Sequence, residues 1–184
     1  MPRLFIGIKI DSKNIISIAN ELKKQFSSSN IAWVEPQNFH LTLKFLGDVD
    51  VNLIDSISNI LIRISSEYNS FELISLQLGY FGSIYQPRVI WYGFKSNPIL
   101  ALLQDDIDHS LHELGFDLET KEFNAHLTFG RVKHINEQER YREILKGSLT
   151  NVNTIVVSQF QLIESILRKE GPEYKVLKVF ELQK

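Results

Sequence analysis

Apolar residues recur along the chain with two spacings, and these spacings predict its helices and strands. Residues 3–10 are rich in Leu, Ile and Phe in a run too short for a helix of normal length, which predicts a buried strand. In three other segments apolar side chains recur every three or four residues, as on one face of an amphipathic helix. Asp11 or Ser12 is expected to cap the first helix, and Asn97-Pro98 to open the third. The three helices are expected over residues 12–26, 53–64 and 98–114.

Shorter apolar runs separated by turn residues predict the remaining strands. These runs lie at residues 31–34, 39–46, 71–78, 88–94, 125–132, 152–164 and 174–182. A charged helix is expected at 136–146, and a turn at 168–172. Several strands follow one another directly, with little strict alternation of strand and helix. This order is typical of an α+β fold with largely antiparallel sheets.

Composition narrows the class of protein without naming a function. The chain has 184 residues, a formal net charge of −2 and no Cys, and 43% of its residues are hydrophobic. It can bury a core, and it has no disulfide scaffold, thiolate zinc site or cysteine nucleophile. The near-balanced charge argues against a protein that coats long nucleic acid but allows recognition of one phosphate or strand end.

The apolar segments also bear on where the protein works. No segment is long and apolar enough for a signal peptide or a membrane span. We therefore expect a soluble, cytoplasmic protein with no membrane partner.

One short repeat carries candidate chemistry. His40-Leu41-Thr42 is echoed by His126-Leu127-Thr128, at an offset of 126 − 40 = 86 residues. Alternate side chains of a strand share a face, so the His and Thr of each copy point the same way while the Leu between them points into the core. The wide separation allows each copy to lie in a lobe of its own.

Two such pairs facing each other across a cleft would supply two imidazoles and two hydroxyls, a set suited to a phosphate diester without metal. A neutral imidazole can remove a proton from water on one side of phosphorus, and an imidazolium can protonate the departing oxygen on the other. The hydroxyls can donate to the non-bridging oxygens, where negative charge accumulates. A single His-x-Thr in a strand is more often only a half-buried polar pair. The hypothesis of a catalytic site therefore rests on the presence of two copies.

The chain resembles the 2H phosphoesterase superfamily, which is named for two His-x-Thr/Ser motifs. Within it, the chain is similar to the bacterial and archaeal RNA 2',3'-cyclic phosphodiesterases, the LigT-like (2'-5' RNA ligase-like) enzymes. The resemblance runs nearly end to end and rests on residues 3–8, 33–47, 87–91, 126–132, 164–167 and 171–174. Departures such as Phe129, where Leu is usual, remove no catalytic group.

The resemblance implies that residues 1–184 form one bilobal, pseudo-two-fold symmetric α+β domain, with helices flanking two mainly antiparallel sheets and a central cleft. Each lobe would carry one motif. It implies hydrolysis of a terminal 2',3'-cyclic phosphate on RNA to a 2'-phosphomonoester. By position, His40 would be the proton donor to the leaving 3'-oxygen and His126 the proton acceptor that activates water, with Thr42 and Thr128 assisting. No cofactor or metal is implied, and we expect a monomer.

Similar enzymes join tRNA half-molecules through a 2'-5' bond in vitro, so the resemblance includes ligation and tRNA fragments as substrates. Two alternatives stay open. One is a related esterase acting on small cyclic nucleotide phosphates or 2'-5' oligonucleotides. The other is a non-catalytic module that binds RNA ends.

Three cations near the motifs are candidates for substrate binding. Strict alternation puts Lys44 on the face of the first motif, as either a phosphate ligand or a solvated charge at the cleft rim. Arg131 should face away from the second motif unless Gly130 introduces a bulge that turns it inward. Arg88 either lines the same groove or forms a surface ion pair.

Two further groups of residues are candidates for base stacking and for metal binding. Three aromatic side chains are candidates to stack on the terminal base, although such residues more often lie in a core: Trp33, Phe39 and Tyr174. Four others have helix spacings that suit a metal: Asp105, Asp108, His109 and His112. Because the apolar stripe of the same helix is already defined, these four are better explained as a solvated face. His134 is expected in a loop and has no assigned role.

Overall fold

The named strands pair antiparallel throughout the part of the chain that the computed structural model describes, residues 1–146, 152–168 and 171–184. Their order is β7-β4-β5-β6-β3-β1-β8-β9, and β2 pairs with β6 as well. The strands are β1 Arg3–Lys9, β2 Asn30–Trp33, β3 His40–Asp48, β4 Phe71–Gly82, β5 Pro87–Phe94, β6 His126–His134, β7 Thr154–Val157, β8 Gln159–Arg168 and β9 Gly171–Glu181. The helices are α1 Lys13–Gln25, α2 Ile54–Ser65, α3 Pro98–His112 and α4 Gln138–Lys146, with 3-10 turns η1 Pro36–Asn38 and η2 Val51–Leu53.

Two helix starts follow the capping chemistry expected from the sequence. The Ser12 side chain accepts a hydrogen bond from the backbone N–H of Ile15 at the start of α1. Asn97 accepts one from Leu100 at the start of α3, where Pro98 occupies the first turn. Each cap satisfies a backbone donor that has no partner within its helix.

The run at 152–164 differs from the single strand expected there. It forms two strands, β7 and β8, interrupted at Ser158. β7 pairs with β4 and β8 pairs with β1, so the chain crosses from one half of the sheet to the other at this point. At the expected turn, Arg168 pairs with Gly171, and residues 169 and 170 lie outside the described residues.

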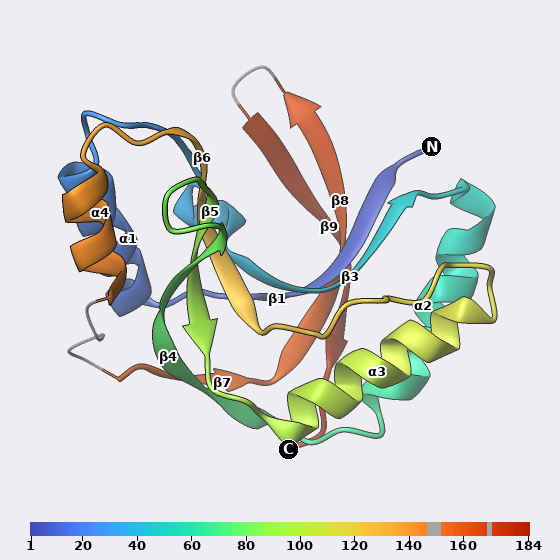
Figure 1. Ribbon diagram of the computed structural model, residues 1–184. Helices are drawn as coiled ribbons and strands as arrows, with labels where there is room; N and C mark the ends of the chain where they lie inside the picture. Colours follow the sequence, from blue (N-terminus) through green and yellow to red (C-terminus); the bar gives the residue numbers. More distant parts are fainter. Residues whose placement is uncertain (147–151, 169–170) are drawn as a thin grey trace.

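The helices form two pairs on opposite sides of the molecule (Figure 1). α1 and α4 meet through the rings of Phe26 and Tyr141, whose centroids are 5.7 Å apart. α2 and α3 meet on the other side, where Arg63 donates to the Ser110 hydroxyl over 3.2 Å. Each pair covers the strands of its own half, as expected for a bilobal arrangement. None of the helices in the described ranges is long and apolar enough to cross a bilayer.

The two halves of the sheet meet where β3 lies beside β6. Their pairing consists of Leu41 opposite Leu127, both fully buried. The α+β class and the antiparallel strands are thereby confirmed. The two expected sheets are joined into one hydrogen-bonded path by this narrow contact, which puts the two repeats side by side at the centre.

Each of these two strands has one extra residue directly after its motif. In β3, Gly7 pairs with Thr42 and Ile6 pairs with Lys44, so Leu43 has no partner in the register. Side chains of paired residues share a face, and successive residues alternate faces. The extra residue therefore reverses the alternation beyond Thr42.

The same irregularity occurs in β6. Trp91 pairs with Thr128 and Ile90 pairs with Gly130, so Phe129 is the extra residue. The pseudo-symmetry of the two halves therefore extends from the sequence repeat to the backbone that follows it.

Candidate active site

The register between β3 and β6 brings the two motifs onto one face. Because Leu41 lies opposite Leu127 in an antiparallel pair, His40 is directed across from Thr128, and His126 across from Thr42. In a regular pair, Cβ atoms directly across are about 5 Å apart and diagonal ones roughly 7–8 Å. All four motif side chains line a cleft of about 780 Å³. The histidines therefore have room for a small group between them.

Both imidazoles are held in the same way. His40 Nδ1 lies 3.1 Å from the carbonyl oxygen of Asn38, and His126 Nδ1 lies 2.7 Å from that of Asn124. A carbonyl oxygen only accepts hydrogen bonds, so each Nδ1 must carry the hydrogen. The Nε2 atoms are thus left as the nitrogens that can take or give a proton, and that of His40 is buried beside Gln161.

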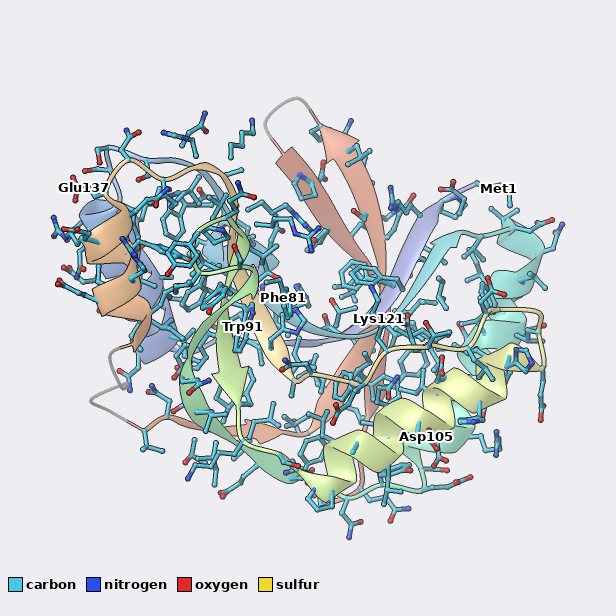
Figure 2. The ribbon with its side chains drawn as sticks, viewed as in Figure 1. Met1, Phe81, Trp91, Asp105, Lys121 and Glu137 are labelled. Atoms are coloured by element: carbon cyan, nitrogen blue, oxygen red, sulfur yellow. The ribbon has the colours of Figure 1, made fainter. Side chains whose placement is uncertain are left out.

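Aromatic rings enclose each histidine. The ring of His126 meets Phe81 edge-on, with centroids 4.8 Å apart, and lies 6.1 Å from Trp91. Figure 2 shows Phe81 and Trp91 together on β4 and β5. His40 has corresponding neighbours in Tyr174, at 5.6 Å, and a phenylalanine of β1, at 6.0 Å.

Burial among these rings changes the acidity of the imidazoles. Loss of hydration lowers the pKa of His40 and of His126 below the ordinary histidine value, and the backbone hydrogen bonds oppose this effect. The ammonium of Lys9, the cross-strand neighbour of His40, lowers the pKa of His40 further. Neutral imidazole is therefore favoured at both positions when the cleft is empty of anions.

The two threonines are half-buried beside the histidines. Within the described ranges, neither the Thr42 nor the Thr128 hydroxyl has a hydrogen-bond partner. Both hydroxyls can therefore donate to a group bound in the cleft.

Arg131 lies on the cleft face. It pairs with Val89 beyond the extra residue of β6, which turns its side chain to the same side as Thr128. Burial raises the pKa of Tyr174, and the positive charge of Arg131 opposes this effect. The sequence predicted that Arg131 faces the cleft only if a bulge occurs at Gly130. The structure has this bulge one residue earlier, at Phe129.

Lys44 requires a correction. The extra residue in β3 puts Lys44 on the face opposite Thr42, so the prediction from strict alternation was wrong. It is 2% exposed, and so is not a solvated charge at the cleft rim. Its ammonium forms an ion pair with Asp108 and donates to the carbonyl of Asp117 over 2.7 Å. Lys44 still borders the cleft, but its charge is directed toward α3.

Of the four α3 residues whose spacing suits a metal, Asp108 forms the ion pair with Lys44. Asp108 is buried rather than solvated, because it holds both Lys44 and the backbone N–H of Glu119. Asp105 and His109 form an exposed ion pair, as expected of a wet face. Across the described ranges, no three His, Cys, Asp or Glu side chains are grouped so as to hold a metal ion.

Comparison with known proteins places this cleft in a family. The model of the LigT like Phosphoesterase family matches residues 8–91 and 95–174. The chain belongs to this family. The match confirms the family resemblance predicted from the sequence.

Two curated relatives match the chain over nearly its whole length. The chain is 35% identical to the RNA 2',3'-cyclic phosphodiesterase of Archaeoglobus fulgidus, over 97% of this chain and 99% of the relative. It is 33% identical to the protein of that name from Thermotoga maritima, over 95% and 92%. Its fold matches the crystal structure of E. coli LigT complexed with 3'-AMP, with a TM-score of 0.80 and 22% identity over 100% and 99% of the two chains.

The three aromatic residues considered for base stacking lie in different environments. Phe39 is fully buried and packs against Phe129, so it belongs to the core. Trp33 is partly buried against the core, where its ring would contact any side chain added at Gly130. Tyr174 alone of the three lies beside a histidine of the repeated motif. His134 ends β6 and is exposed, rather than lying in a loop.

Several cleft residues of the phosphoesterase were missed in the sequence. The segment between α3 and β6 lines one wall; its contributions are Glu119, Lys121, Glu122, Phe123 and Asn124. No periodicity marks this segment, which has no regular structure. Phe45 was missed because alternation alone puts it in the core, whereas the structure leaves it 66% exposed on the cleft.

Proposed function

We propose that this phosphoesterase hydrolyses 2',3'-cyclic phosphates at RNA 3' ends to 2'-phosphomonoesters. The observation that carries the proposal is the pairing of Leu41 with Leu127, which sets the His and Thr of both motifs on one face of a cleft. The relatives named RNA 2',3'-cyclic phosphodiesterase match the chain over nearly its whole length, which supports the same substrate class.

In the proposed reaction, Nε2 of neutral His126 takes a proton from water as the water oxygen attacks phosphorus. The bond from phosphorus to the 3'-oxygen breaks, and protonated His40 donates its Nε2 proton to that oxygen. The product has a 2'-phosphomonoester and a free 3'-hydroxyl. The histidines end with their protonation states exchanged, and proton exchange with solvent restores them. Side chains make both proton transfers, so the proposed reaction needs neither metal nor cofactor.

Charge that develops on the non-bridging oxygens has three donors available. The hydroxyls of Thr42 and Thr128 lie on the face of the histidines, and the guanidinium of Arg131 faces the same cleft. Donors already in place stabilise the transition state without having to reorganise. Phe45 and Tyr174 present aromatic surface beside this site, on which the terminal base can stack.

The proposal is tested with an RNA oligonucleotide that ends in a 2',3'-cyclic phosphate, incubated with the protein in excess EDTA. We expect mass spectrometry to show the gain of one water and chemical mapping to place the phosphate on the 2'-oxygen. The same RNA with a free 3'-hydroxyl is the control and should be unchanged. Retention of the cyclic end contradicts the activity, and a need for added divalent metal contradicts the metal-free mechanism.

The same assay separates the alternatives. Turnover of 2',3'-cyclic mononucleotides or 2'-5' oligonucleotides in preference to RNA ends indicates the small-substrate esterase. Binding of the cyclic end without turnover indicates the non-catalytic module. With a second RNA bearing a 5'-hydroxyl, such as a tRNA half-molecule, that hydroxyl replaces water as the nucleophile. A 2'-5' linkage formed in this way would require the same two histidines.

We infer that one chain suffices for this activity. The chain itself supplies both His-x-Thr motifs to the cleft, and the sheet continues through both halves. The proposed unit is therefore one domain of two lobes, each carrying one motif, acting as a monomer. Activity proportional to concentration, together with a monomeric mass by light scattering, is the expected result.

A further inference from the structure

Two arginines of the cleft have no carboxylate partner. Within the described ranges, neither Arg88 nor Arg131 forms an ion pair, and both side chains line the cleft. Three arginines elsewhere do have such partners: Arg63 with Glu67, Arg140 with Glu137 and Arg168 with Glu173. Unpaired guanidinium groups at a cleft that takes phosphate are candidates for anion binding. Arg131 is already accounted for by the cyclic phosphate, which leaves Arg88.

The backbone turns Arg88 toward the cleft. Phe81 of β4 pairs with Val89 of β5, whereas the next residue, Gly82, pairs with Pro87. Arg88 is therefore an extra residue in β5, at a third register shift beside the same cleft. Gly82 has a positive φ of 103°, and a Cβ there would lie 2.6 Å from the backbone oxygen of Gln86. The hairpin that presents Arg88 thus depends on a glycine at this position.

Arg88 lies next to the arginine assigned to the cyclic phosphate. Its neighbour Val89 is the cross-strand partner of Arg131. Paired Cα atoms lie about 5 Å apart, so the two guanidinium groups start from adjacent positions on adjacent strands. They are offset along the sheet, as two successive phosphates of one RNA strand would require.

The opposite wall of the cleft disfavours a second phosphate. In the segment that leads to β6 it carries two carboxylates, Glu119 and Glu122, against one ammonium, that of Lys121. Lys121 is labelled in Figure 2. A polyanion leaving the catalytic histidines is repelled by these carboxylates and attracted by Arg88. The charge asymmetry therefore directs the RNA strand along β5.

We propose that Arg88 binds the first internal phosphodiester on the 5' side of the cyclic end, so that the enzyme prefers oligonucleotides to cyclic mononucleotides. This inference rests on the proposed hydrolysis of cyclic phosphates. It adds a second phosphate subsite and defines the substrate as RNA with at least one internal phosphate.

The test compares two substrates, a 2',3'-cyclic mononucleotide and a dinucleotide that ends in the same cyclic nucleotide. In wild-type protein, kcat/KM should be higher for the dinucleotide. Arg88→Gln should lower the ratio of the two kcat/KM values about tenfold, as expected for loss of one charge-assisted hydrogen bond. Arg88→Lys should retain part of the preference, because the charge remains. Arg63→Gln, an ion-paired arginine on α2, is the matched control and should leave both values unchanged.

A change in the substrate provides a second measurement. A dinucleotide with an uncharged methylphosphonate in place of its internal phosphate should lose the advantage in wild-type protein, and Arg88→Gln should then have no further effect on the ratio. An unchanged ratio in Arg88→Gln overturns the subsite while leaving the hydrolysis intact. A wild-type protein that hydrolyses neither substrate overturns the proposed function, and the subsite with it.

Discussion

At the scale of single residues, the candidate site depends on how two imidazoles are held. A backbone carbonyl two residues earlier binds Nδ1 in both cases, from Asn38 to His40 and from Asn124 to His126. This contact fixes the ring and leaves Nε2 for chemistry, without any carboxylate beneath the histidine. Neutral backbone partners stabilise the imidazolium less than a carboxylate would, which agrees with the lowered pKa of both groups.

Removal of either imidazole should abolish one of two proton transfers. We expect His40→Ala and His126→Ala each to lower kcat by roughly 10²–10⁴-fold on RNA with a cyclic end, measured by single-turnover kinetics. His134→Ala is the matched control, because His134 is an exposed histidine at the far end of β6. Near-wild-type activity in both motif variants would show that the assigned mechanism is wrong.

The pH dependence of kcat/KM should also report these two groups. His126 must be neutral and His40 protonated, so activity rises with pH as His126 loses its proton and falls as His40 loses its own. Because burial lowers both pKa values below 6.5, the bell-shaped profile should have its maximum below about pH 6.5. Lys9→Gln should move the limb that reports His40 to higher pH, since the Lys9 ammonium lowers the pKa of His40. A profile that still rises at pH 8 would contradict this assignment.

At the scale of elements, single extra residues decide which side chains reach the cleft. One such residue after each Thr turns Arg131 in β6 toward the cleft and Lys44 in β3 away from it. Lys44 then joins β3 to α3 and to the segment that follows α3, through Asp108 and the carbonyl of Asp117. The wall of the cleft opposite Arg88 is thereby tied to the strand that carries His40.

This buried ion pair should matter more to stability than to binding. The side chains of Lys44 and Asp108 are 1% and 7% exposed. Lys44→Met leaves a buried carboxylate without its cation and should lower the free energy of unfolding by about 3–5 kcal/mol, measured by urea denaturation. The double change Lys44→Met with Asp108→Leu should recover much of this loss, because no uncompensated charge remains. A single variant as stable as wild type would refute the role of the pair.

At the scale of the whole molecule, few of the 20 Lys and Arg side chains are proposed to contact the substrate. The net charge is −2, and the proposed contacts to phosphate come from two arginines of one cleft. We therefore expect the protein to bind the end of an RNA strand and not to coat the strand. Its electrostatic attraction to RNA should therefore be weak and confined to the cleft.

Salt dependence measures the number of phosphates contacted. For single strands, each contact contributes a slope of about −0.7 in a plot of log affinity against log salt concentration. With two contacts, log(kcat/KM) for an RNA end should fall with a slope of about −1.4, and Arg88→Gln should reduce the slope by about 0.7. A slope several times steeper would indicate contacts over a much larger surface and contradict this assignment.

The sequence alone predicted most elements, because they depend on local chemistry. Apolar spacing predicted α1, α2 and α3, and capping by Ser12 and Asn97 located two of their starts. The interruption at Ser158 was missed, because local composition does not show that the chain crosses from one half of the sheet to the other there.

The candidate site likewise depends partly on local sequence and partly on tertiary structure. The repeat at His40 and His126 and the family resemblance that it carries were determined by the sequence, since residue identity and spacing along a strand suffice for both. Only the tertiary structure decided that Leu41 pairs with Leu127, that Lys44 is buried against Asp108, and which residues face the cleft. Register and bulges are set by pairing between strands far apart in the chain, and strict alternation within one strand contains no information about them.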